Sequence, residues 1–305
     1  VYVCLPTLIE YIKCYIPAKV RDNPMNQLPP EVSQLIDAAI LEDQTFNDPT
    51  SQVLIPTDVA GKGMLRAKAN GILAGIDVAK AVFHRVDNDL DFQSLLSDGD
   101  ILSPGSDIAL VHGSAGSILR AERIALNFLQ RMSGIASDTN AYVNAVSGYD
   151  ARIVDTRKTV PGHRYLDKYA VRMGGGFNHR MNLADGILIK DNHIEALRSQ
   201  ELGLKEVVQK ALAGASHTIK VEVEVESIEA LREALEAGAD IIMLDNMDVD
   251  QMRQAMHIAK GKVIVEASGG INLETVRSVA ETGVDLISIG GLTHSTSALD
   301  ISLDL

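Results

Sequence analysis

The C-terminal half of the chain shows a regular alternation of short apolar runs and amphipathic stretches. Six apolar runs each lead directly into a polar cluster, and the last four begin near Ile219, Ile241, Val263 and Leu286. This spacing of about 22 residues is long enough for one strand and one helix. The gaps contain helical patterns such as residues 227–237, which precede a glycine. We therefore predict repeated strand–helix units with parallel strands.

The length of this region limits the size of the barrel that the strands can form. From Ala151 to Gly291 the chain offers about 140 residues, whereas a complete eight-unit barrel needs about 250. We therefore predict an α/β fold with a six-stranded, incomplete βα barrel. Active sites of such barrels lie at the C-terminal ends of the strands, where all six polar clusters fall.

Residues 27–116 lack this period and predict a small N-terminal α+β sandwich domain. Pro29 and Pro30 begin one predicted helix, and residues 76–86 form another. We expect the polar stretch 48–51 to form a loop. Turn signals separate short strand-like runs, which lie at 53–55, 63–69, 91–96 and 108–112.

The segments at the two ends of the barrel region complete the predicted organisation. A helix is predicted from Ser117 to about Met132, with Gly134 as its C-terminal cap. The final run, 299–305, alternates strictly between apolar and polar residues. A barrel strand buried on both faces would not alternate so cleanly, so we expect this run to pair with the N-terminal sheet. The predicted domains are therefore an atypical N-terminal extension at 1–26, a sandwich formed by 27–116 plus 295–305, and connecting helices with a catalytic barrel at 117–294.

Basic residues are concentrated in one segment of an acidic protein. The chain has a formal net charge of −13, yet residues 151–194 contain eight Arg and Lys residues against four Asp residues. Such a segment suggests a focused site for a small anion with several charges, although paired surface charges would give the same count. Nucleic acid would normally require a broader basic face, so neither nucleic acid nor an anionic membrane is an expected partner.

The cysteines bear on the class of protein. Cys4 and Cys14 both lie in the N-terminal extension, which excludes a disulfide framework and a cysteine-ligated zinc site. This usage fits a reducing compartment, and we expect a cytoplasmic protein. The apolar part of the extension is too short to span a bilayer, and Glu10 and Lys13 interrupt it.

Two kinds of cluster are candidates for binding anions. Ser268-Gly269-Gly270 and Gly290-Gly291 follow the last two barrel strands, where backbone N–H groups can bind a phosphate, although a single Gly-Gly pair usually marks only a turn. Arg157 and Arg180 could clamp the two carboxylates of an aromatic ring, because a guanidinium binds a planar carboxylate with two parallel hydrogen bonds.

One predicted strand carries three acidic residues at alternate positions. Glu222, Glu224 and Glu226 alternate, so they point to one side, which is either a solvent-facing edge or an acidic inner face. Buried carboxylates would need cations nearby. In that case Glu224 and Asp245 could share Mg²⁺ or ribose hydroxyls, since hard oxygen ligands without cysteine favour Mg²⁺ over zinc.

Three motifs in the basic region resemble a known family. The strings D-T-R-K-T-x-P-G, V-R-x-G-G-G-x-N-H-R and L-I-K-D-N-H-I are similar to those of quinolinate phosphoribosyltransferase, also called nicotinate-nucleotide diphosphorylase (carboxylating). The resemblance extends from about Leu28 to the C-terminus. It implies the type II phosphoribosyltransferase architecture and a reaction of quinolinate with phosphoribosyl pyrophosphate. The products would be nicotinate mononucleotide, pyrophosphate and carbon dioxide, a step of NAD biosynthesis.

The resemblance also implies a role for individual residues. Quinolinate would be bound by Arg123, Arg157, His179, Arg180 and Lys190. Phosphoribosyl pyrophosphate would be bound by Lys158, Glu224, Asp245, Ser268, Gly269, Gly270, Gly290, Gly291 and His294. The catalytic set would be Lys158, Lys190, Glu224 and Asp245, with Mg²⁺ held by Glu224 and Asp245 directly or through water. Arg123 would act in the neighbouring subunit's site, which implies a homodimer that could assemble further.

Three other functions compete with this reading. A nicotinate phosphoribosyltransferase, or a relative from molybdate uptake gene clusters, would not need two carboxylate clamps. A non-catalytic phosphate-sugar binding protein would not need the acids Glu224 and Asp245 beside its anion. A lyase or aldolase on a βα barrel could use Lys190 to form a Schiff base.

Overall fold

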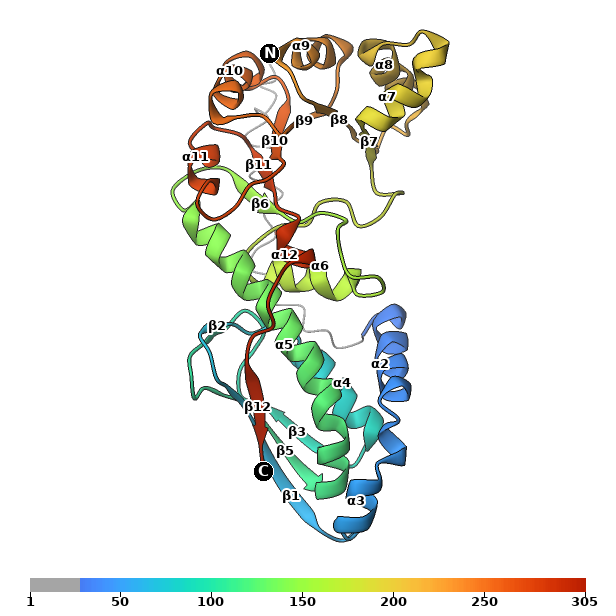
Figure 1. The fold of residues 1–305 in the computed structure, drawn as a ribbon, viewed down its shortest axis with the longest axis vertical. Coiled ribbons are helices and arrows are strands. Elements are labelled where there is room, and N and C mark those ends of the chain that lie inside the picture. Colours follow the sequence, from blue (N-terminus) through green and yellow to red (C-terminus); the bar gives the residue numbers. More distant parts are fainter. Residues whose placement is uncertain (1–27) are drawn as a thin grey trace, which may run out of the picture.

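The computed structural model describes residues 28–305, so the predictions for the N-terminal extension lie outside the described residues. Figure 1 shows two bodies along the long axis of the molecule, a parallel sheet with surrounding helices and an antiparallel sheet, with the long helix α5 running between them. None of the described helices has the length and apolar character to cross a membrane.

The barrel prediction is confirmed. Six parallel strands form one sheet in the order β6-β11-β10-β9-β8-β7. The strands β6 and β7 follow each other in the sequence but occupy opposite edges, so the barrel stays open between them. The strands are β6 (Arg152–Val154), β7 (Ile187–Ile189), β8 (Val221–Val225), β9 (Ile241–Asp245), β10 (Ile264–Ser268) and β11 (Leu286–Ser288).

Helices connect these strands on the outside of the barrel (Figure 1). Most of these helices supply buried residues from their apolar side to the core, such as Leu231 and Ala234 of α9, whereas α7 has no buried residue. Gly238 ends α9 with a positive φ of 88°, as its position in the sequence predicts. The helical elements are α6 (Arg164–Met173), α7 (Asp191–Leu197), η3 (Arg198–Gln200), α8 (Leu204–Gly214), α9 (Ile228–Ala237), α10 (Val249–Ala259), α11 (Val276–Ala280) and α12 (Gly291–His294).

The N-terminal sheet contains the last strand of the chain. Its order is β12-β1-β5-β3, and β12 runs antiparallel to β1 with Met64 opposite Asp304. The expected pairing of the C-terminal run is therefore confirmed. Helix α4 also has the predicted bounds. The strands of this sheet are β1 (Ala60–Ala67), β3 (Asp91–Ser94), β5 (Asp107–Ser114) and β12 (Ile301–Asp304). Strands β2 (Gly71–Ile72) and β4 (Ile101–Leu102) pair with each other in a separate two-stranded sheet. The helices are α2 (Pro30–Glu42), η2 (Thr45–Asn47), α3 (Pro49–Leu54), α4 (Ile76–Val86) and α5 (Ala115–Ala145).

The predicted loop at 48–51 and the strand at 53–55 are wrong. Both belong largely to α3, whose first N–H groups are capped by Asp48: its carboxylate accepts hydrogen bonds from the backbone of Thr50 at 2.9 Å and Ser51 at 3.2 Å. An Asp followed by Pro is a helix start as well as a turn signal. Val53 is 80% exposed, so its apolar character does not mark a buried strand.

The predicted end of the long helix is also wrong. Helix α5 continues through Gly134 to Ala145. A Cβ at Gly134 would lie 2.0 Å from the carbonyl oxygen of Ser297. The glycine is therefore required for close packing of the chain that leads to β12, and it does not end the helix.

Candidate functional site

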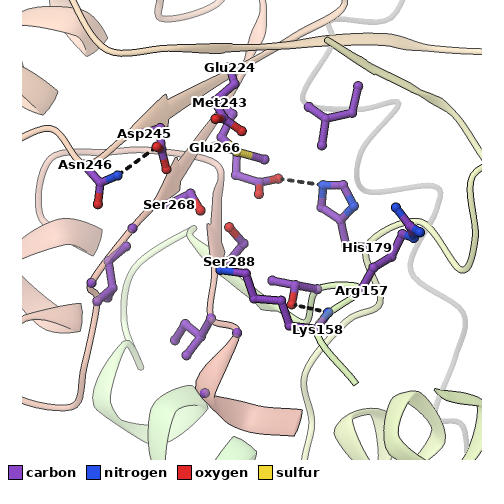
Figure 2. A pocket seen from close by; sticks show the side chains of 18 of the residues that line it. Arg157, Lys158, His179, Glu224, Met243, Asp245, Asn246, Glu266, Ser268 and Ser288 are labelled. Carbon is purple, nitrogen blue, oxygen red and sulfur yellow. Dashed lines mark hydrogen bonds and ion pairs between the residues drawn. The ribbon is translucent and has the colours of Figure 1, made fainter. Parts of the chain in front are cut away.

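A cavity of about 850 Å³ opens at the C-terminal ends of the barrel strands (Figure 2). It brings together every residue predicted for the site except Arg123. These lining residues are Arg157, Lys158, His179, Arg180, Lys190, Glu224, Asp245, Ser268, Gly269, Gly270, Gly290, Gly291 and His294. Arg123 lies on α5, its side chain is 60% exposed, and its guanidinium is 3.8 Å from its own neighbour Glu122.

Basic side chains that follow β6 form one wall of the cavity. Figure 2 shows Arg157 and Lys158 across the cavity from Glu224 and Asp245. The backbone of Lys158 is fixed on two sides, since its N–H donates to Thr156 Oγ1 at 3.0 Å and its carbonyl accepts from Thr293 Oγ1 at 2.7 Å. The loop after β6 is therefore held by α12, which follows the neighbouring strand β11.

Arg157 and Arg180 are prepared to bind an anion. The buried Nε of Arg157 has no hydrogen-bond partner within residues 28–305. Burial lowers the pKa of the Arg180 guanidinium, and the charge of Arg157 lowers it further. Arg180 also donates from Nη1 to the carbonyl oxygen of Gly186 at 3.2 Å. Two like charges held together in a cavity are relieved by a multiply charged anion.

A buried ion pair fixes the backbone that presents His179. Asp155 and Lys168 form this pair, with side chains 0% and 1% exposed. The Asp155 carboxylate accepts the His179 N–H at 2.9 Å and the Asn178 side-chain amide at 2.6 Å. Lys168 Nζ donates to the carbonyl oxygen of His179 at 3.1 Å. Both polar groups of this residue's backbone are therefore held by one ion pair.

The His179 ring lies between two buried acids. Its Nε2 is 3.2 Å from Glu222 Oε2 and 3.4 Å from Glu266 Oε2, and its Nδ1 accepts the backbone N–H of Arg180 at 2.8 Å. Burial lowers the pKa of His179, but the close contacts with the two acids and their negative charges outweigh burial and raise it. Burial likewise raises the pKa of Glu222.

The amide hydrogen bond decides which ring nitrogen carries the proton. A proton on Nδ1 would face the N–H of Arg180, and this N–H belongs to the backbone and cannot turn away. The acids favour a second proton on the ring, but the only nitrogen left for it is Nδ1, where it would meet the N–H of Arg180. We therefore assign a single ring proton to Nε2, which points at the acids. One atom each of His179, Glu222 and Glu266 lie within 4.8 Å of one another, a spacing that could suit a metal ion. A protonated Nε2 has no lone pair for a metal, so this cluster does not fit one.

Acids from adjacent strands form the opposite wall (Figure 2). Glu224 on β8 forms an ion pair with Lys190, and the Glu224 side chain is 10% exposed. Asp245 at the end of β9 accepts a hydrogen bond from the Asn246 side chain at 2.8 Å. The inner-face alternative for the acids of β8 is therefore correct for Glu222 and Glu224, whereas Glu226 is exposed.

Two glycines allow strand ends to approach each other at the cavity. Gly269 has a φ of 93°, and a Cβ there would lie 2.3 Å from Asn246 Oδ1. A Cβ at Gly290 would lie 3.1 Å from Lys158 Cδ and 3.2 Å from His294 Nε2. Side chains at either position would displace the neighbouring residues that line the cavity.

The sequence reasoning missed several residues that shape the site. Asp155, Lys168, Glu222 and Glu266 received no role, although they position or contact His179. A signal was present for Glu266, which stands in the apolar run Val263 to Ala267 and is completely buried. A charged residue in the middle of a buried strand needs a partner in the core.

The chain matches two family models, the N-terminal domain of quinolinate phosphoribosyl transferase over residues 48–133 and its C-terminal domain over residues 135–304. It is 44% identical to a probable nicotinate-nucleotide pyrophosphorylase (carboxylating) from Bacillus subtilis, over 92% of this chain and 95% of that protein. It is 40% identical to the mitochondrial quinolinate phosphoribosyltransferase (decarboxylating) 2 of Nicotiana glauca, over 98% of this chain and 91% of that protein.

A solved structure agrees with the sequence comparisons. The nicotinate-nucleotide pyrophosphorylase from Francisella tularensis superposes with a TM-score of 0.85 at 39% identity, covering 92% of this chain and 99% of that one. The chain therefore belongs to the quinolinate phosphoribosyltransferase family.

Proposed function

We propose that this protein transfers phosphoribosyl from phosphoribosyl pyrophosphate to quinolinate and releases carbon dioxide, giving nicotinate mononucleotide and pyrophosphate. The observation that carries the proposal is the charge distribution in one cavity. Arg157, whose Nε has no hydrogen-bond partner among residues 28–305, faces Glu224 and Asp245 across the cavity, and Arg180 lines the same cavity. Basic groups bind the dicarboxylate, and the acids stand where positive charge develops on the sugar.

The pyridine nitrogen is the nucleophile, so the reaction requires no nucleophilic side chain. Its lone pair forms the bond to the anomeric carbon while the carbon–oxygen bond to pyrophosphate breaks. Glu224 and Asp245 stabilise the positive charge on the sugar, and Lys158 and Lys190 neutralise the leaving pyrophosphate. The positive ring nitrogen then makes the adjacent carboxylate easy to lose, because the electron pair left on the ring carbon is stabilised before that carbon takes up a proton.

Glu224 and Asp245 fit Mg²⁺ by their chemistry. Both are carboxylates that line the same cavity, and hard oxygen ligands are the ones that Mg²⁺ prefers. Glu224 already forms an ion pair with Lys190, so water between the carboxylates and the ion suits the site. When bound, the ion would offset negative charge on the pyrophosphate.

The active protein in this proposal is a homodimer. Arg123 does not line the cavity of its own chain and is exposed on α5. Large apolar side chains along α2, η2 and α3 are each more than half exposed, namely Leu41, Phe46, Val53 and Leu54. Exposed apolar surface of this kind suits a protein partner. A second copy would cover it and could bring its own Arg123 to the first cavity.

A cytoplasmic location stays a prediction, since the Nicotiana glauca relative is named mitochondrial. The competing nicotinate-type transferase is disfavoured by the two neighbouring arginines, because nicotinate has one carboxylate. The lyase alternative requires a Schiff base on Lys190, which borohydride would trap in the presence of substrate; we expect no trapped adduct.

The test is a product assay with purified protein, quinolinate, phosphoribosyl pyrophosphate and Mg²⁺. We expect carbon dioxide and pyrophosphate to appear together, and the Arg157→Ala variant to raise the KM for quinolinate. Arg232→Ala is the matched control, because Arg232 is exposed on α9 and does not line the cavity. If the unmodified protein released no carbon dioxide from quinolinate under these conditions, the proposed function would be wrong.

A further inference from the structure

Neither ring nitrogen of His179 is available to quinolinate. Nδ1 accepts the backbone N–H of Arg180 at 2.8 Å, and Nε2 points at Glu222 and Glu266 at 3.2 and 3.4 Å. A lone pair on Nδ1 cannot donate to a carboxylate. A carboxylate that approached Nε2 would come close to two negative charges in a buried region, where repulsion is strong.

The two acids require an explanation of their own. Glu222 is 5% exposed and Glu266 is completely buried. Glu222 Oε1 and both oxygens of Glu266 accept no hydrogen bond from the part of the chain that the structure describes. Buried carboxylates next to a pocket for a dicarboxylate are costly and oppose binding of the substrate. The two buried acids must therefore serve a function in the site that offsets this cost.

The position of the acids indicates this function. A second cavity of about 290 Å³ lies at the opposite ends of the strands and is lined by Glu222, Glu266, His179 and Arg180. Glu266, His179 and Arg180 also line the main cavity, so they form the layer between the two. Because cavities lie on two sides of the imidazole, we infer that its orientation depends on the contacts of Nε2 with the two acids as well as on packing.

We propose that Glu222 and Glu266 are positioning residues that hold the His179 ring so that it orients Arg180 toward quinolinate. The proposal rests on the proposed function and deepens it. The acids of β8 and β10 hold Nε2, the ring holds the Arg180 N–H through Nδ1, and Arg180 reaches the main cavity. His179 therefore serves quinolinate through Arg180 and not through a nitrogen of its own.

Two double variants separate this role from the effect of charge. Glu222→Leu with Glu266→Leu, and Glu222→Gln with Glu266→Gln, remove the same two charges, but only the glutamines keep polar oxygens next to Nε2, which lies 3.2 and 3.4 Å from the two carboxylates. We expect the KM for quinolinate to be about tenfold higher in the leucine pair than in the glutamine pair. The KM for phosphoribosyl pyrophosphate should be the same in both. Glu226→Gln is the control, because Glu226 is exposed and directly follows β8.

Equal KM values for quinolinate in the two pairs would overturn the proposal, because the acceptor oxygens would then have no role. So would an equal rise in the KM for both substrates, which would indicate general damage to the barrel. Failure of the proposed function itself is distinct, since the unmodified protein would then release no carbon dioxide from quinolinate.

A second measurement leaves Glu222 and Glu266 unchanged and therefore tests the proposal even if the leucine pair does not fold. Nitrogen-15 NMR of histidine-labelled protein reports which ring nitrogen carries the proton, and the His179 signals are assigned by their loss in His179→Gln. We expect a proton on Nε2 and none on Nδ1, with no change when quinolinate is added. A proton on Nδ1, or a quinolinate-dependent loss of the Nε2 contact, would contradict the proposal.

Discussion

Replacing Lys168 with methionine tests the buried ion pair that holds the backbone of His179. The side chains of Lys168 and Asp155 are 1% and 0% exposed, so water does not screen the pair. Burial raises the pKa of Asp155 and lowers the pKa of Lys168. The charge of each residue opposes the effect of burial on the pKa of its partner. Lys168→Met leaves the carboxylate buried with only the Asn178 amide and the His179 N–H as donors. Loss of one partner of such a pair costs about 3–5 kcal/mol.

The free energy of unfolding, measured by circular dichroism in urea, checks this magnitude. Asp155→Asn alone should also destabilise, but the double variant should cost less than the sum of the single variants by about 1–3 kcal/mol, because it leaves no unpaired charge. Lys205→Met is the matched control: its ion pair with Glu236 at 3.2 Å is exposed and should contribute about 0–1 kcal/mol. Strictly additive costs, or a Lys168→Met variant as stable as Lys205→Met, would refute the reasoning.

Three further predictions concern the clamp, the dimer and the packing of α5. Arg180→Ala should raise the KM for quinolinate about 10- to 100-fold with little change in the KM for the sugar donor, since a charge-assisted contact contributes about 1.5–3 kcal/mol; steady-state kinetics measures both. Mixing inactive Arg123→Ala and Lys190→Ala subunits should restore activity at about a quarter of all sites if dimers form at random. No recovery would mean that Arg123 acts in the site of its own subunit or has no role in catalysis. Gly134→Ala should lower stability by about 1–3 kcal/mol, because its Cβ would overlap a backbone carbonyl. Gly214→Ala is its control, since among residues 28–305 no atom outside its own stretch of helix lies within 4 Å of a Cβ there; equal melting temperatures for the two variants would contradict the packing argument.

The barrel was predictable because its signal repeats. Each apolar run of the C-terminal half ends in a polar cluster, and parallel strands bring their C-terminal ends to one edge. Arg157, Lys158, Lys190, Asp245 and the glycines near 269 and 290 were therefore predictable from their positions after the strands, whereas the roles of His179 and His294 came from the family resemblance. The role of Arg123 could not be predicted from a pattern, because nothing in the sequence of α5 distinguishes it from a solvated arginine. Its assignment to the neighbouring subunit's site came from the family resemblance alone.

The errors have two physical causes, namely contacts between residues distant in the sequence and a local helix cap that the strand-like pattern does not reveal. Gly134 reads as a helix end, but the chain near Ser297 packs against it and α5 continues. Val53 and Leu54 read as a strand, but the cap from Asp48 makes them the end of a short helix. Glu222 and Glu266 are 44 positions apart in the sequence, and only the closure of the sheet places both beside His179.

The central claim is that one cavity binds a dicarboxylated pyridine beside phosphoribosyl pyrophosphate. The most direct test measures carbon dioxide and pyrophosphate released from quinolinate labelled in the carboxylate next to the ring nitrogen, with nicotinate as the competing substrate. We predict one carbon dioxide for each pyrophosphate, full dependence on phosphoribosyl pyrophosphate and Mg²⁺, and no comparable turnover of nicotinate. Equal use of nicotinate, or carbon dioxide release without the sugar donor, would contradict the account.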